Sequence, residues 1–592
     1  MKNFIQTVLA EADYQPVRLL QILRAVQSYY QYIPPEAIDY LAEGLKIPRS
    51  HIIAVAEFYS FFHLTPQGRY EILISDSITD RILGKDSLMD YLSTVLKVPV
   101  GQVRSDGLVS LNNTSCTGIC DQGPAGLVNG YPLTRLDRPK ADEIATLIDQ
   151  EKPLAEWPAY LFAVADNIRK AGLLLEQPIA NGAGLSAGFA RGIQATLGEI
   201  DRSGLRGRGG AGFKTAMKWK FCAEEKSDKH YVVCNADEGE PGTFKDRVLL
   251  NSYADQVFEG MTLCGAIIGA EQGFLYLRGE YLYLKDKLQA ILQLRRDTGL
   301  LGKNILNQGL NFDIEICLGA GAYICGEESA LIESLEGKPG IPRNRPPYPV
   351  TQGYLNKPTV VNNVETFLAA TAIVVNGGEW FAKVGTDKSA GSKILSISGD
   401  CALPGIYEYP FGTPISLILH DCGAEDVLGV QVGGPSGTFI SNQELDRKLA
   451  FEDLATGGSF IVFNKSRSIT GIVQNFMHFF AHESCGFCTP CRVGTSLLSN
   501  QLDKIVDGHG SAGDVVELEA LCQLVKNHSH CGLGQTAANP ILTTLQRYPD
   551  AYESRLKDIS YEPGFDLDGA LDVARRMAHR DDAAAHLTQV ED

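Results

Sequence analysis

The chain has 592 residues, of which 44% are hydrophobic and 21% charged, so several globular domains are expected and disordered or fibrous classes are excluded. Its 71 acidic and 53 basic side chains give a net charge of −18, which argues against nucleic-acid or anionic-membrane binding. The N-terminus fits neither a secretory signal nor a transit peptide, and no apolar run reaches the ~20 residues that span a bilayer. We therefore expect a cytoplasmic protein whose 14 cysteines serve metal binding rather than disulfides.

The first 150 residues predict two units. Apolar residues three and four apart in 19–27, 34–45 and 50–62 indicate helices, so residues 1–65 are expected to form a helical bundle. A β-rich run at 70–75, a helical run at 87–97 and a strand at 107–111 indicate a small α/β domain over residues 66–150. A polar segment with prolines then predicts a linker at 151–182.

The remainder predicts three further units, which makes the whole chain a multidomain α/β protein. Residues 183–390 are rich in glycine and alternate strands with helices, as an α/β domain does. Residues 391–467 contain recurring short strands and match the size of a ubiquitin-like unit. Residues 468–548 have a helical pattern, and 549–592 are expected to be a C-terminal tail that frays at its end.

The run SCGFCTPCRVGT has the spacing of a metal site. Cys485, Cys488 and Cys491 can hold three corners of a cubane iron–sulfur cluster, which needs a fourth thiolate. Cys531 lies in a glycine-rich turn and is the best fourth candidate, whereas Cys522 lies in a helical run and is expected in the core. Four thiolates also suit zinc, but zinc ribbons usually pair one C-x2-C with another, so a cluster is favoured.

A glycine-rich loop, SGLRGRGGAGFKTAMKWKF, predicts a phosphate-bearing ligand. Gly207, Gly209 and Gly212 satisfy G-x-G-x-x-G, but the preceding EIDRSGLR is polar and a poor strand, which disfavours a Rossmann fold. Backbone N–H groups at adjacent glycines can approach phosphate, and basic side chains add charge. These basic residues are Arg206, Arg208, Lys214 and Lys218. The alternative is a flexible surface loop.

Three further segments place carboxylates and amides near glycines or after β-rich runs. Such groups suit hydrogen bonds to ribityl or ribose hydroxyls, to a phosphate or to a ring edge. Charged, solvated loops are the alternative. The segments are CNADEGEPGTFKDR with Asn235, Asp237, Glu238 and Glu240, GAGAYICGEESAL with Tyr323, Gly326, Glu327 and Glu328, and PTVVNNVET with Asn362 and Asn363.

Taken together, GRGGAGF, NADEGEPGTFKDR, GAGAYICGEESAL, PTVVNNVET and SCGFCTPCRVGT resemble, in order and spacing, the flavoprotein subunits of the NADH-oxidising module of respiratory complex I. The resemblance covers residues 184–546 and implies FMN, an NAD(H) site and one [4Fe-4S] cluster. It also implies a non-Rossmann flavin domain, a ubiquitin-like SLBB domain and a helical cluster domain. Hydride then passes between cofactors, and no side chain is expected to act as a general acid or base.

The resemblance also implies particular site residues. Flavin contacts fall on Gly207, Gly209, Lys218, Asn235, Asp237, Tyr323, Gly326, Glu327, Asn362 and Asn363. Nucleotide contacts fall on Gly210, Phe213, Phe221, Glu240, Glu328, Arg345 and Tyr348, the last two standing where the family more often has Lys and Phe. Arg208, Glu238 and Thr366 are included as further cofactor-binding positions, and Cys485, Cys488, Cys491 and Cys531 as cluster ligands.

The N-terminal 150 residues resemble the small thioredoxin-like partner subunit of the same module, here fused. The segments YIPPEAIDYLAEGLKIP and VAEFYSFFHLTPQGRY carry this resemblance. That family holds a [2Fe-2S] cluster with a C-x4-C and a C-x3-C pair. Cys116 and Cys120 match the second pair, but Ser75 and Asp80 stand at the first, so we predict no [2Fe-2S] cluster here.

Fusion, the degenerate cysteine pair and the lack of an added C-terminal ferredoxin domain most resemble the diaphorase subunits of cytoplasmic NAD-reducing [NiFe] hydrogenases. The resemblance implies NAD⁺ reduction with electrons from a partner iron–sulfur diaphorase subunit and from large and small hydrogenase subunits, without membrane insertion. The corresponding subunits of NAD-dependent formate dehydrogenase and of complex I are the alternatives. A catalytically silent scaffold is disfavoured because the glycines and the four cysteines are intact.

Overall fold

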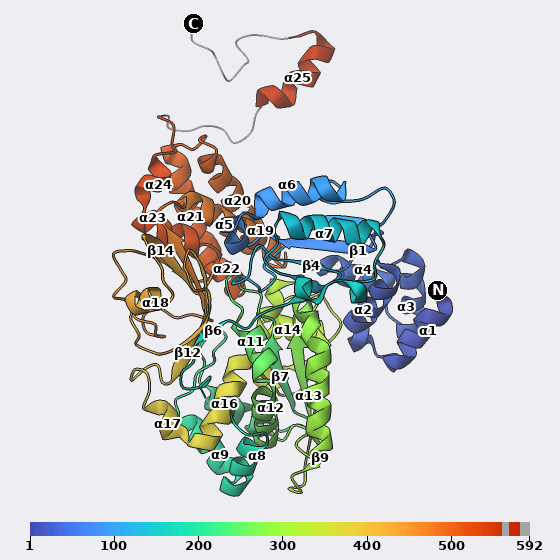
Figure 1. Cartoon of the computed structure of the whole chain (residues 1–592), viewed down its shortest axis with the longest axis vertical. Coiled ribbons are helices and arrows are strands. Elements are labelled where there is room, and N and C mark those ends of the chain that lie inside the picture. Colours follow the sequence, from blue (N-terminus) through green and yellow to red (C-terminus); the bar gives the residue numbers. More distant parts are fainter. Residues whose placement is uncertain (177, 559–566, 581–592) are drawn as a thin grey trace.

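The computed structural model describes residues 1–176, 178–558 and 567–580 (Figure 1). The end of the chain where fraying is expected, 581–592, lies outside this part. Within the described ranges, none of the helices combines the length and the apolar character that crossing a bilayer requires.

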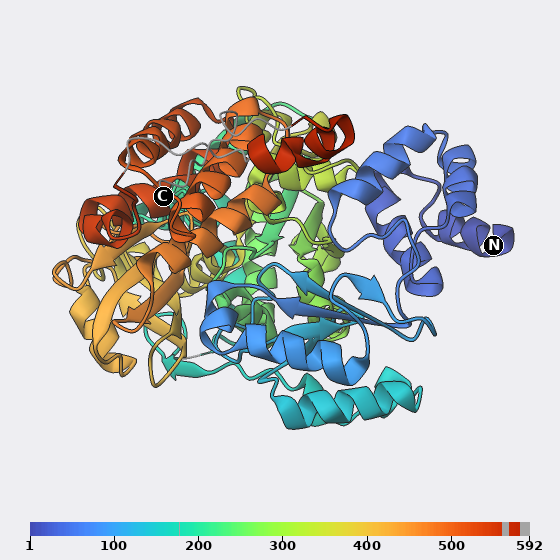
Figure 2. The ribbon, with the colours of Figure 1, turned by 90° about the horizontal axis from the view of Figure 1, so that it is seen from above.

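Four helices form the N-terminal bundle, which lies at one side of the molecule (Figures 1 and 2). They confirm the three predicted helical runs. The bundle is fastened to the central domain by side chains of its second helix, because Gln21 donates to Leu318 O (2.8 Å) and Arg24 to Gly319 O (2.6 Å). The elements are α1 (Lys2–Glu11), η1 (Pro16–Arg18), α2 (Leu19–Tyr30), α3 (Pro35–Leu45) and α4 (Arg49–Phe58).

The thioredoxin-like unit is a five-stranded sheet in the order β2-β3-β1-β4-β5, with its own apolar core. Strand β1 (Tyr70–Ser75), as predicted, runs parallel to β3 (Val109–Thr114), and Ser75 lies beside Thr114 at their carboxyl ends. This register brings Ser75 close to the loop that carries Cys116. The other elements are α5 (Ile78–Ile82), α6 (Lys85–Leu96), β2 (Gln102–Val103), β4 (Gly126–Val128), β5 (Tyr131–Leu133) and α7 (Arg138–Asp149).

The segment 151–182, expected as a linker, takes part in the fold. It contains η2 (Leu154–Glu156), η3 (Ala159–Phe162) and strand β6 (Ile168–Lys170). Strand β6 pairs in parallel with β13 (Gly405–Pro410), which is more than two hundred residues further along the chain. Backbone hydrogen bonds at a sheet edge, which no local pattern in the sequence announces, therefore fix this segment.

The central domain has a sheet in the order β11-β7-β8-β10-β9, with the first four strands parallel. Successive residues of β7 face opposite sides: Val232 and Cys234 pack with α12 and α16, whereas Tyr231 and Val233 share a core with the N-terminal bundle. The strands are β7 (Tyr231–Ala236), β8 (Gln272–Leu277), β9 (Gly302–Ile305), β10 (Leu310–Leu318) and β11 (Thr359–Asn363).

Helices α12 and α16 cover one face of the sheet, and α14 packs with the N-terminal bundle on the other. Because the carboxyl ends of parallel strands meet at one edge, the polar segments after β7, β10 and β11 come together there. The helices are α8 (Ala183–Arg191), α9 (Ile193–Arg202), α10 (Thr215–Glu224), α11 (Lys245–Ser252), α12 (Ala254–Ile268), η4 (Gly279–Leu284), α13 (Lys285–Asp297), η5 (Tyr323–Gly326), α14 (Glu328–Leu335), α15 (Pro349–Gln352), η6 (Tyr354–Asn356), α16 (Val364–Asn376) and α17 (Gly378–Ala382).

The third sheet has the order β15-β14-β16-β12-β13-β6, with α18 (Ile415–Asp421) on one face and C-terminal helices against the other. Strands β12 (Ser392–Gly399), β13 and β16 (Ser459–Asn464) confirm the predicted runs KILSISG, GIYEYP and SFIVF. Strands β14 (Val427–Val432) and β15 (Thr438–Ser441) lie outside those runs. The C-terminal helices are α19 (Ile469–Glu483), α20 (Thr489–Val506), α21 (Ala512–His528), α22 (Gly532–Ala537), α23 (Asn539–Arg547), α24 (Pro549–Glu553) and α25 (Leu567–Ala578). Tyr552 in α24 is fully buried, so the packed body extends into the segment that was expected to be tail.

Candidate functional site

The glycine-rich loop lies between helices α9 and α10, so a helix rather than a strand precedes it. Residues Arg206 and Lys214 close the loop through a β-bridge, and Gly207 N donates to Phe213 O (2.8 Å). Gly210 has φ +129°, a conformation that side chains rarely adopt, and open space lies where its Cβ would be. The loop therefore offers exposed backbone to a neighbouring cavity.

A cavity of about 580 Å³ lies beside this loop, at the carboxyl edge of the central sheet. Ten of the predicted cofactor-binding residues line it: Gly209, Gly210, Asn235, Asp237, Glu238, Glu240, Tyr323, Gly326, Glu327 and Asn363. The others do not appear in this lining: Gly207, Arg208, Phe213, Lys218, Phe221, Glu328, Arg345, Tyr348, Asn362 and Thr366. Half of the predicted cofactor-binding residues therefore line the cavity, and the other half lie outside its lining.

Asp237 carries the clearest sign of an unfilled ligand position. Its backbone N–H donates to Asn235 Oδ1 (3.1 Å), and the Asn235 amide donates to Gly326 O (2.8 Å). Asp237 lines the cavity, and its Oδ2 atom is buried and has no hydrogen-bond partner. Burial raises the pKa of this carboxyl well above its ordinary value. A buried acceptor without a donor fits a ligand that brings hydroxyl groups.

Two glutamates near Asp237, Glu238 and Glu240, line the cavity and accept hydrogen bonds from different partners. Glu240 accepts from Tyr323 OH (2.5 Å) and Ser436 N (2.8 Å), which fixes its carboxylate at the cavity wall, and burial raises its pKa. Glu238 accepts from Asp246 N and from Tyr281 OH (both 2.8 Å), and burial raises its pKa to about 7. Glu238 therefore anchors the start of α11 as well as lining the cavity.

Arg208 does not present its charge to the cavity. Its guanidinium is buried against the rings of Phe381, Phe411 and Phe451, and burial lowers its pKa to about 10. Only its backbone remains with the loop, where Arg208 N donates to Thr366 Oγ1 (3.0 Å). The expectation that this side chain provides loop charge is wrong, because three aromatic faces offer it a cation–π site in the interior.

Other predicted residues lie behind the cavity and hold its wall. Lys218 Nζ bonds Glu328 (2.7 Å) and Val361 O (2.9 Å). The Trp219 indole donates to Asn362 Oδ1 (2.8 Å), which occupies that amide. Arg345 lies 3.2 Å from Glu327 Oε1.

Three aromatic rings predicted to contact nucleotide are exposed at the surface. Phe213 is 49%, Phe221 43% and Tyr348 53% exposed. Their exposure is what stacking on an adenine requires.

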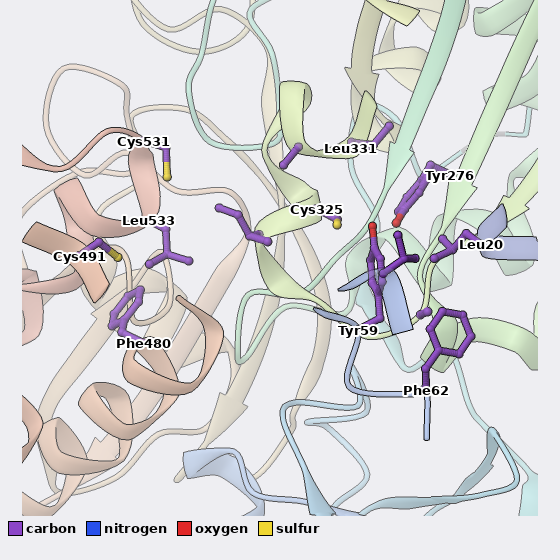
Figure 3. Packing of buried hydrophobic residues seen from close by; sticks show 14 of the residues in the cluster. Leu20, Tyr59, Phe62, Tyr276, Cys325, Leu331, Phe480, Cys491, Cys531 and Leu533 are labelled. Atoms are coloured by element: carbon purple, nitrogen blue, oxygen red, sulfur yellow. The ribbon is translucent and has the colours of Figure 1, made fainter. Parts of the chain in front are cut away.

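Four cysteines from two segments line a second, smaller cavity. Cys485, Cys488 and Cys491 lie before and in the first turn of α20, and Cys531 lies directly before α22. Figure 3 shows Cys491 and Cys531 near Leu533. Cys522 is fully buried in α21 and does not line this cavity. Burial raises the pKa of Cys491 to about 11 and of Cys531 to about 12, so these thiols keep their protons at neutral pH until a metal displaces them.

Two apolar residues connect the two cavities. Ile324 and Leu533 line both the larger cavity and the cysteine pocket. Among the described residues, only these two side chains are shared between the linings, which places the two sites back to back.

The side chains of Cys116 and Cys120 contact each other. Their sulfurs are 3.2 Å apart, and both residues are buried in the core of the central domain rather than in that of the thioredoxin-like unit. Asp80, which is also buried, accepts from Ser75 Oγ (2.5 Å), Ser77 Oγ (2.7 Å) and Ala125 N (2.8 Å). The carboxylate oxygens that could have replaced thiolates are thus already occupied by protein donors.

Sequence reasoning missed several cavity residues. Lys245, Asp246 and Thr243 lie in the quoted NADEGEPGTFKDR segment, so the motif itself could have pointed to them. Ile324 also lies in a quoted motif, but as an apolar residue it gave no polar signal. Ala211 and Gly239 lie in quoted motifs as well. The remaining missed residues come from other domains: Gly433, Ser436, Gly437, Ala455, Thr456, Gly457, Gly532, Leu533 and Thr536.

Three family models match the chain, and they define its class. The Nuo51 FMN-binding domain matches residues 200–372, the thioredoxin-like [2Fe-2S] ferredoxin 5–149, and the NADH-ubiquinone oxidoreductase-F iron-sulfur binding region 471–555. The larger cavity and the cysteine pocket fall in the first and third of these regions, with added walls from the third sheet. The protein is an iron–sulfur flavoprotein of the NADH-oxidoreductase class.

Its relatives define the family more narrowly. The chain is 42% identical to the NAD-reducing hydrogenase HoxS subunit alpha of Cupriavidus necator, over 96% of this chain and 98% of that one. It is 41% identical to the NADP-reducing hydrogenase subunit HndC of Solidesulfovibrio fructosivorans, over 63% of this chain and 79% of the other. A chain in the crystal structure of an NAD⁺-reducing [NiFe]-hydrogenase in the H2-reduced state superposes with a TM-score of 0.90 at 42% identity, covering 98% of this chain and 99% of that one. The chain belongs to the family of the alpha subunits of NAD-reducing hydrogenases.

Proposed function

We propose that this chain is a diaphorase subunit that exchanges hydride between NAD(H) and FMN and single electrons with one [4Fe-4S] cluster, reducing NAD⁺ with electrons from a partner hydrogenase. The observation that carries the proposal is the pair of adjoining cavities with a shared wall at Ile324 and Leu533. One cavity has polar walls suited to a flavin, and the other is lined by four cysteines.

The inner cavity residues fit FMN. The exposed loop backbone at Gly209 and Gly210 suits a phosphate. Lys245 lies in the same lining, with its ammonium paired to Asp246 (2.6 Å) and Glu365 (3.1 Å). The unpartnered Asp237 Oδ2 suits a ribityl hydroxyl. When bound, FMN supplies the conversion between two-electron hydride transfer and one-electron steps. The protein's residues bind and orient, and none of them has to move a proton.

The nucleotide would bind at the outer residues. Phe213, Phe221 and Tyr348 offer exposed faces for the adenine, and Glu240 holds an acceptor at the cavity wall. Glu328 and Arg345 lie nearby as an ion-pair group with Lys218. The ion pair with Lys218 fixes the carboxylate of Glu328, although Glu328 does not itself line the cavity.

The cysteine pocket suits a cubane better than zinc. A zinc ion draws four thiolates to about 2.3 Å from one centre, whereas a cubane holds them further apart at its corners. In the described part of the chain, no group of three or more His, Cys, Asp or Glu side chains is placed to hold a single ion. The four cysteines nevertheless line a common cavity, which supports Cys485, Cys488, Cys491 and Cys531 as cluster ligands.

We further propose that no [2Fe-2S] cluster forms at Cys116 and Cys120, although the family model that covers this region carries that cluster in its name. The support is chemical: two thiolates are too few, and Asp80 is satisfied by three protein donors.

The finer architecture and assembly are also proposals. In the third unit, β12 lies parallel to β16 at the centre, and α18 follows β13, which supports a ubiquitin-like SLBB unit within 391–467. A helix before the glycine loop supports a non-Rossmann flavin domain. Partners would be an iron–sulfur diaphorase subunit and large and small hydrogenase subunits, in the cytoplasm.

NADH-dependent dye reduction by the full chain reconstituted with FMN tests the chemistry. We expect turnover that requires both FMN and NADH. A chain that binds flavin and shows no dye reduction contradicts the enzyme proposal. Nickel that co-purifies with the native assembly supports the hydrogenase; molybdenum without nickel would instead indicate a formate dehydrogenase.

Two substitutions test the nucleotide site separately from the flavin site. Phe221→Ala should raise the KM for NADH about three- to tenfold, since aromatic stacking contributes ~0.5–1.5 kcal/mol, with the melting temperature unchanged because the ring is half exposed. Glu240→Gln should change nucleotide affinity and leave FMN bound. Loss of FMN in Glu240→Gln would show that this residue contacts the flavin and not the nucleotide.

A further inference from the structure

The cysteine pair that the mechanism does not use has its own chemistry. Cys116 and Cys120 are free thiols with sulfurs 3.2 Å apart. A disulfide has an S–S length of about 2.05 Å, so the two sulfurs need to approach by only ~1 Å. Gly118, between them, has φ +72° and gives the loop its tight turn.

A small cavity lies one residue away from this pair. A cavity of about 10 Å³, the room that one water molecule needs, is lined by Ser115, next to Cys116, and by Arg278. Asp237, Gly239 and Tyr323 line both this small cavity and the flavin cavity. Because both cysteines are almost fully buried, a small oxidant such as hydrogen peroxide suits them better than a bulky disulfide.

The loop is also tied to the flavin cavity by hydrogen bonds. Cys116 O accepts from Arg278 Nη2 (2.6 Å), and Arg278 Nη1 donates to Glu238 O. Gly118 O accepts from Arg247 Nε (3.0 Å), and Arg247 N donates to Glu238 Oε2 (3.3 Å). Both connections end on Glu238, which lines the flavin cavity.

We propose that Cys116 and Cys120 form a reversible thiol–disulfide pair, oxidised by peroxide, whose state is transmitted through Arg278, Arg247 and Glu238 to the flavin cavity. Two thiols and one hydrogen peroxide give one disulfide and two waters: two S–H bonds break, one S–S bond forms, and the peroxide O–O bond is reduced. A cellular dithiol returns the pair to the thiol form by exchange. The transmitted part rests on the proposed flavin site.

Mass spectrometry of the full chain tests the thiol chemistry without any variant. Trypsin should release residues 105–135 as one peptide that contains Cys116 and Cys120 and no other cysteine. After peroxide treatment and alkylation in denaturant, we expect this peptide to escape alkylation and to be two hydrogens lighter than the reduced form, and dithiothreitol to reverse the change. Cys401 and Cys422, a second contacting pair, serve as an internal reference. A peptide that stays reduced while this reference pair oxidises would overturn the proposal.

The FMN dissociation constant, measured by flavin fluorescence, tests transmission. We expect oxidation to change it about fivefold or more in the parent, the lower range of coupling between sites, and to leave it unchanged in Cys116→Ala/Cys120→Ala. Cys401→Ala, as matched control, should respond like the parent. If the disulfide forms and the FMN dissociation constant does not change, transmission to the flavin cavity is wrong. If the parent chain carries two irons that the double variant lacks, Cys116 and Cys120 are iron ligands and not a thiol pair. Failure of every form to bind FMN would instead contradict the proposed function, with the mass result still standing.

Discussion

The pocket of Cys485, Cys488, Cys491 and Cys531 and the loop of Cys116 and Cys120 both present sulfur in turns, but they differ in what surrounds it. In the C-terminal pocket the four cysteines line a cavity shared with Ile324 and Leu533. In the N-terminal loop the two sulfurs contact each other, and serine hydroxyls and a backbone N–H saturate Asp80. Cys491 Sγ does contact Ser484 Oγ (3.3 Å), and Cys488 Sγ accepts from His530 N (3.5 Å), so the two regions do not differ in whether their thiols have protein partners. They differ in number and placement, because four thiols line one cavity in the C-terminal pocket and only two meet in the N-terminal loop.

Removing one cysteine from the C-terminal pocket should have the largest effect. Cys531→Ala leaves three thiolates, and we expect complete loss of the [4Fe-4S] paramagnetic signal and of most bound iron. Cys522→Ala is the matched control, because this cysteine is equally buried nearby yet outside the pocket. It should keep the signal and lose only ~1 kcal/mol of stability through a small cavity. A signal abolished by Cys522→Ala would show that the ligand set is wrong.

Restoring the N-terminal ligands should produce the next largest effect. Ser75→Cys/Asp80→Cys replaces the hydrogen-bonded oxygens with thiols beside Cys116 and Cys120, and we expect up to two additional irons per chain after reconstitution. Iron analysis and the visible absorption spectrum measure this. Ser77→Cys, which alters the same network at a position outside the resemblance, is the control and should add no iron. If the parent chain already carries two irons beyond those of the [4Fe-4S] cluster, the N-terminal loop binds iron itself, and the contrast between the two regions is wrong.

The contrast between these sites was accessible from the sequence because it depends on local spacing. Cysteine spacing predicted the pocket of Cys485, Cys488 and Cys491 and the incomplete N-terminal set, and hydrophobic periodicity predicted the main helices and strands. Glycines flanked by basic residues predicted the loop beside the cavity.

What the sequence did not reveal depends on contacts between distant segments. Arg208 has a basic side chain in a phosphate-type loop, and only the aromatic rings of other elements explain why it turns inward. Ser436 reaches the cavity from the third unit, and β6 completes a sheet across more than two hundred residues. No pattern within a short window carries such information, because burial and pairing are properties of the assembled chain.

The smallest effect concerns the charge of Asp80, and it separates a structural carboxyl from an iron ligand. Burial raises the pKa of Asp80 to about 6, from 3.8 in the unfolded chain. Below about pH 4 the carboxyl is protonated in both the folded and the unfolded chain, so its titration does not lower the free energy of unfolding. As the pH rises through 4 to 6, the unfolded chain releases this proton and the folded chain retains it, so stability falls. Above pH 6 the loss is constant at about 3 kcal/mol, since one pKa unit corresponds to ~1.4 kcal/mol.

Asp80→Asn should therefore stabilise the full chain at pH 8 by up to about 3 kcal/mol and have little effect at pH 4. The amide oxygen can accept from Ala125 N, and the amide nitrogen can donate to the Ser75 and Ser77 hydroxyls, which reverses those two bonds and leaves no charge. Thermal unfolding of both forms at pH 4 and pH 8 measures the difference. Asp76→Asn is the control of opposite sign: burial alone would raise the pKa of Asp76, but Arg81 and Lys85 lower it, so its charge adds stability above its unfolded pKa and the substitution should destabilise at pH 8. If Asp80→Asn instead destabilised the chain at pH 8 and reduced its iron content, Asp80 would be a metal ligand and the N-terminal site would be a working one.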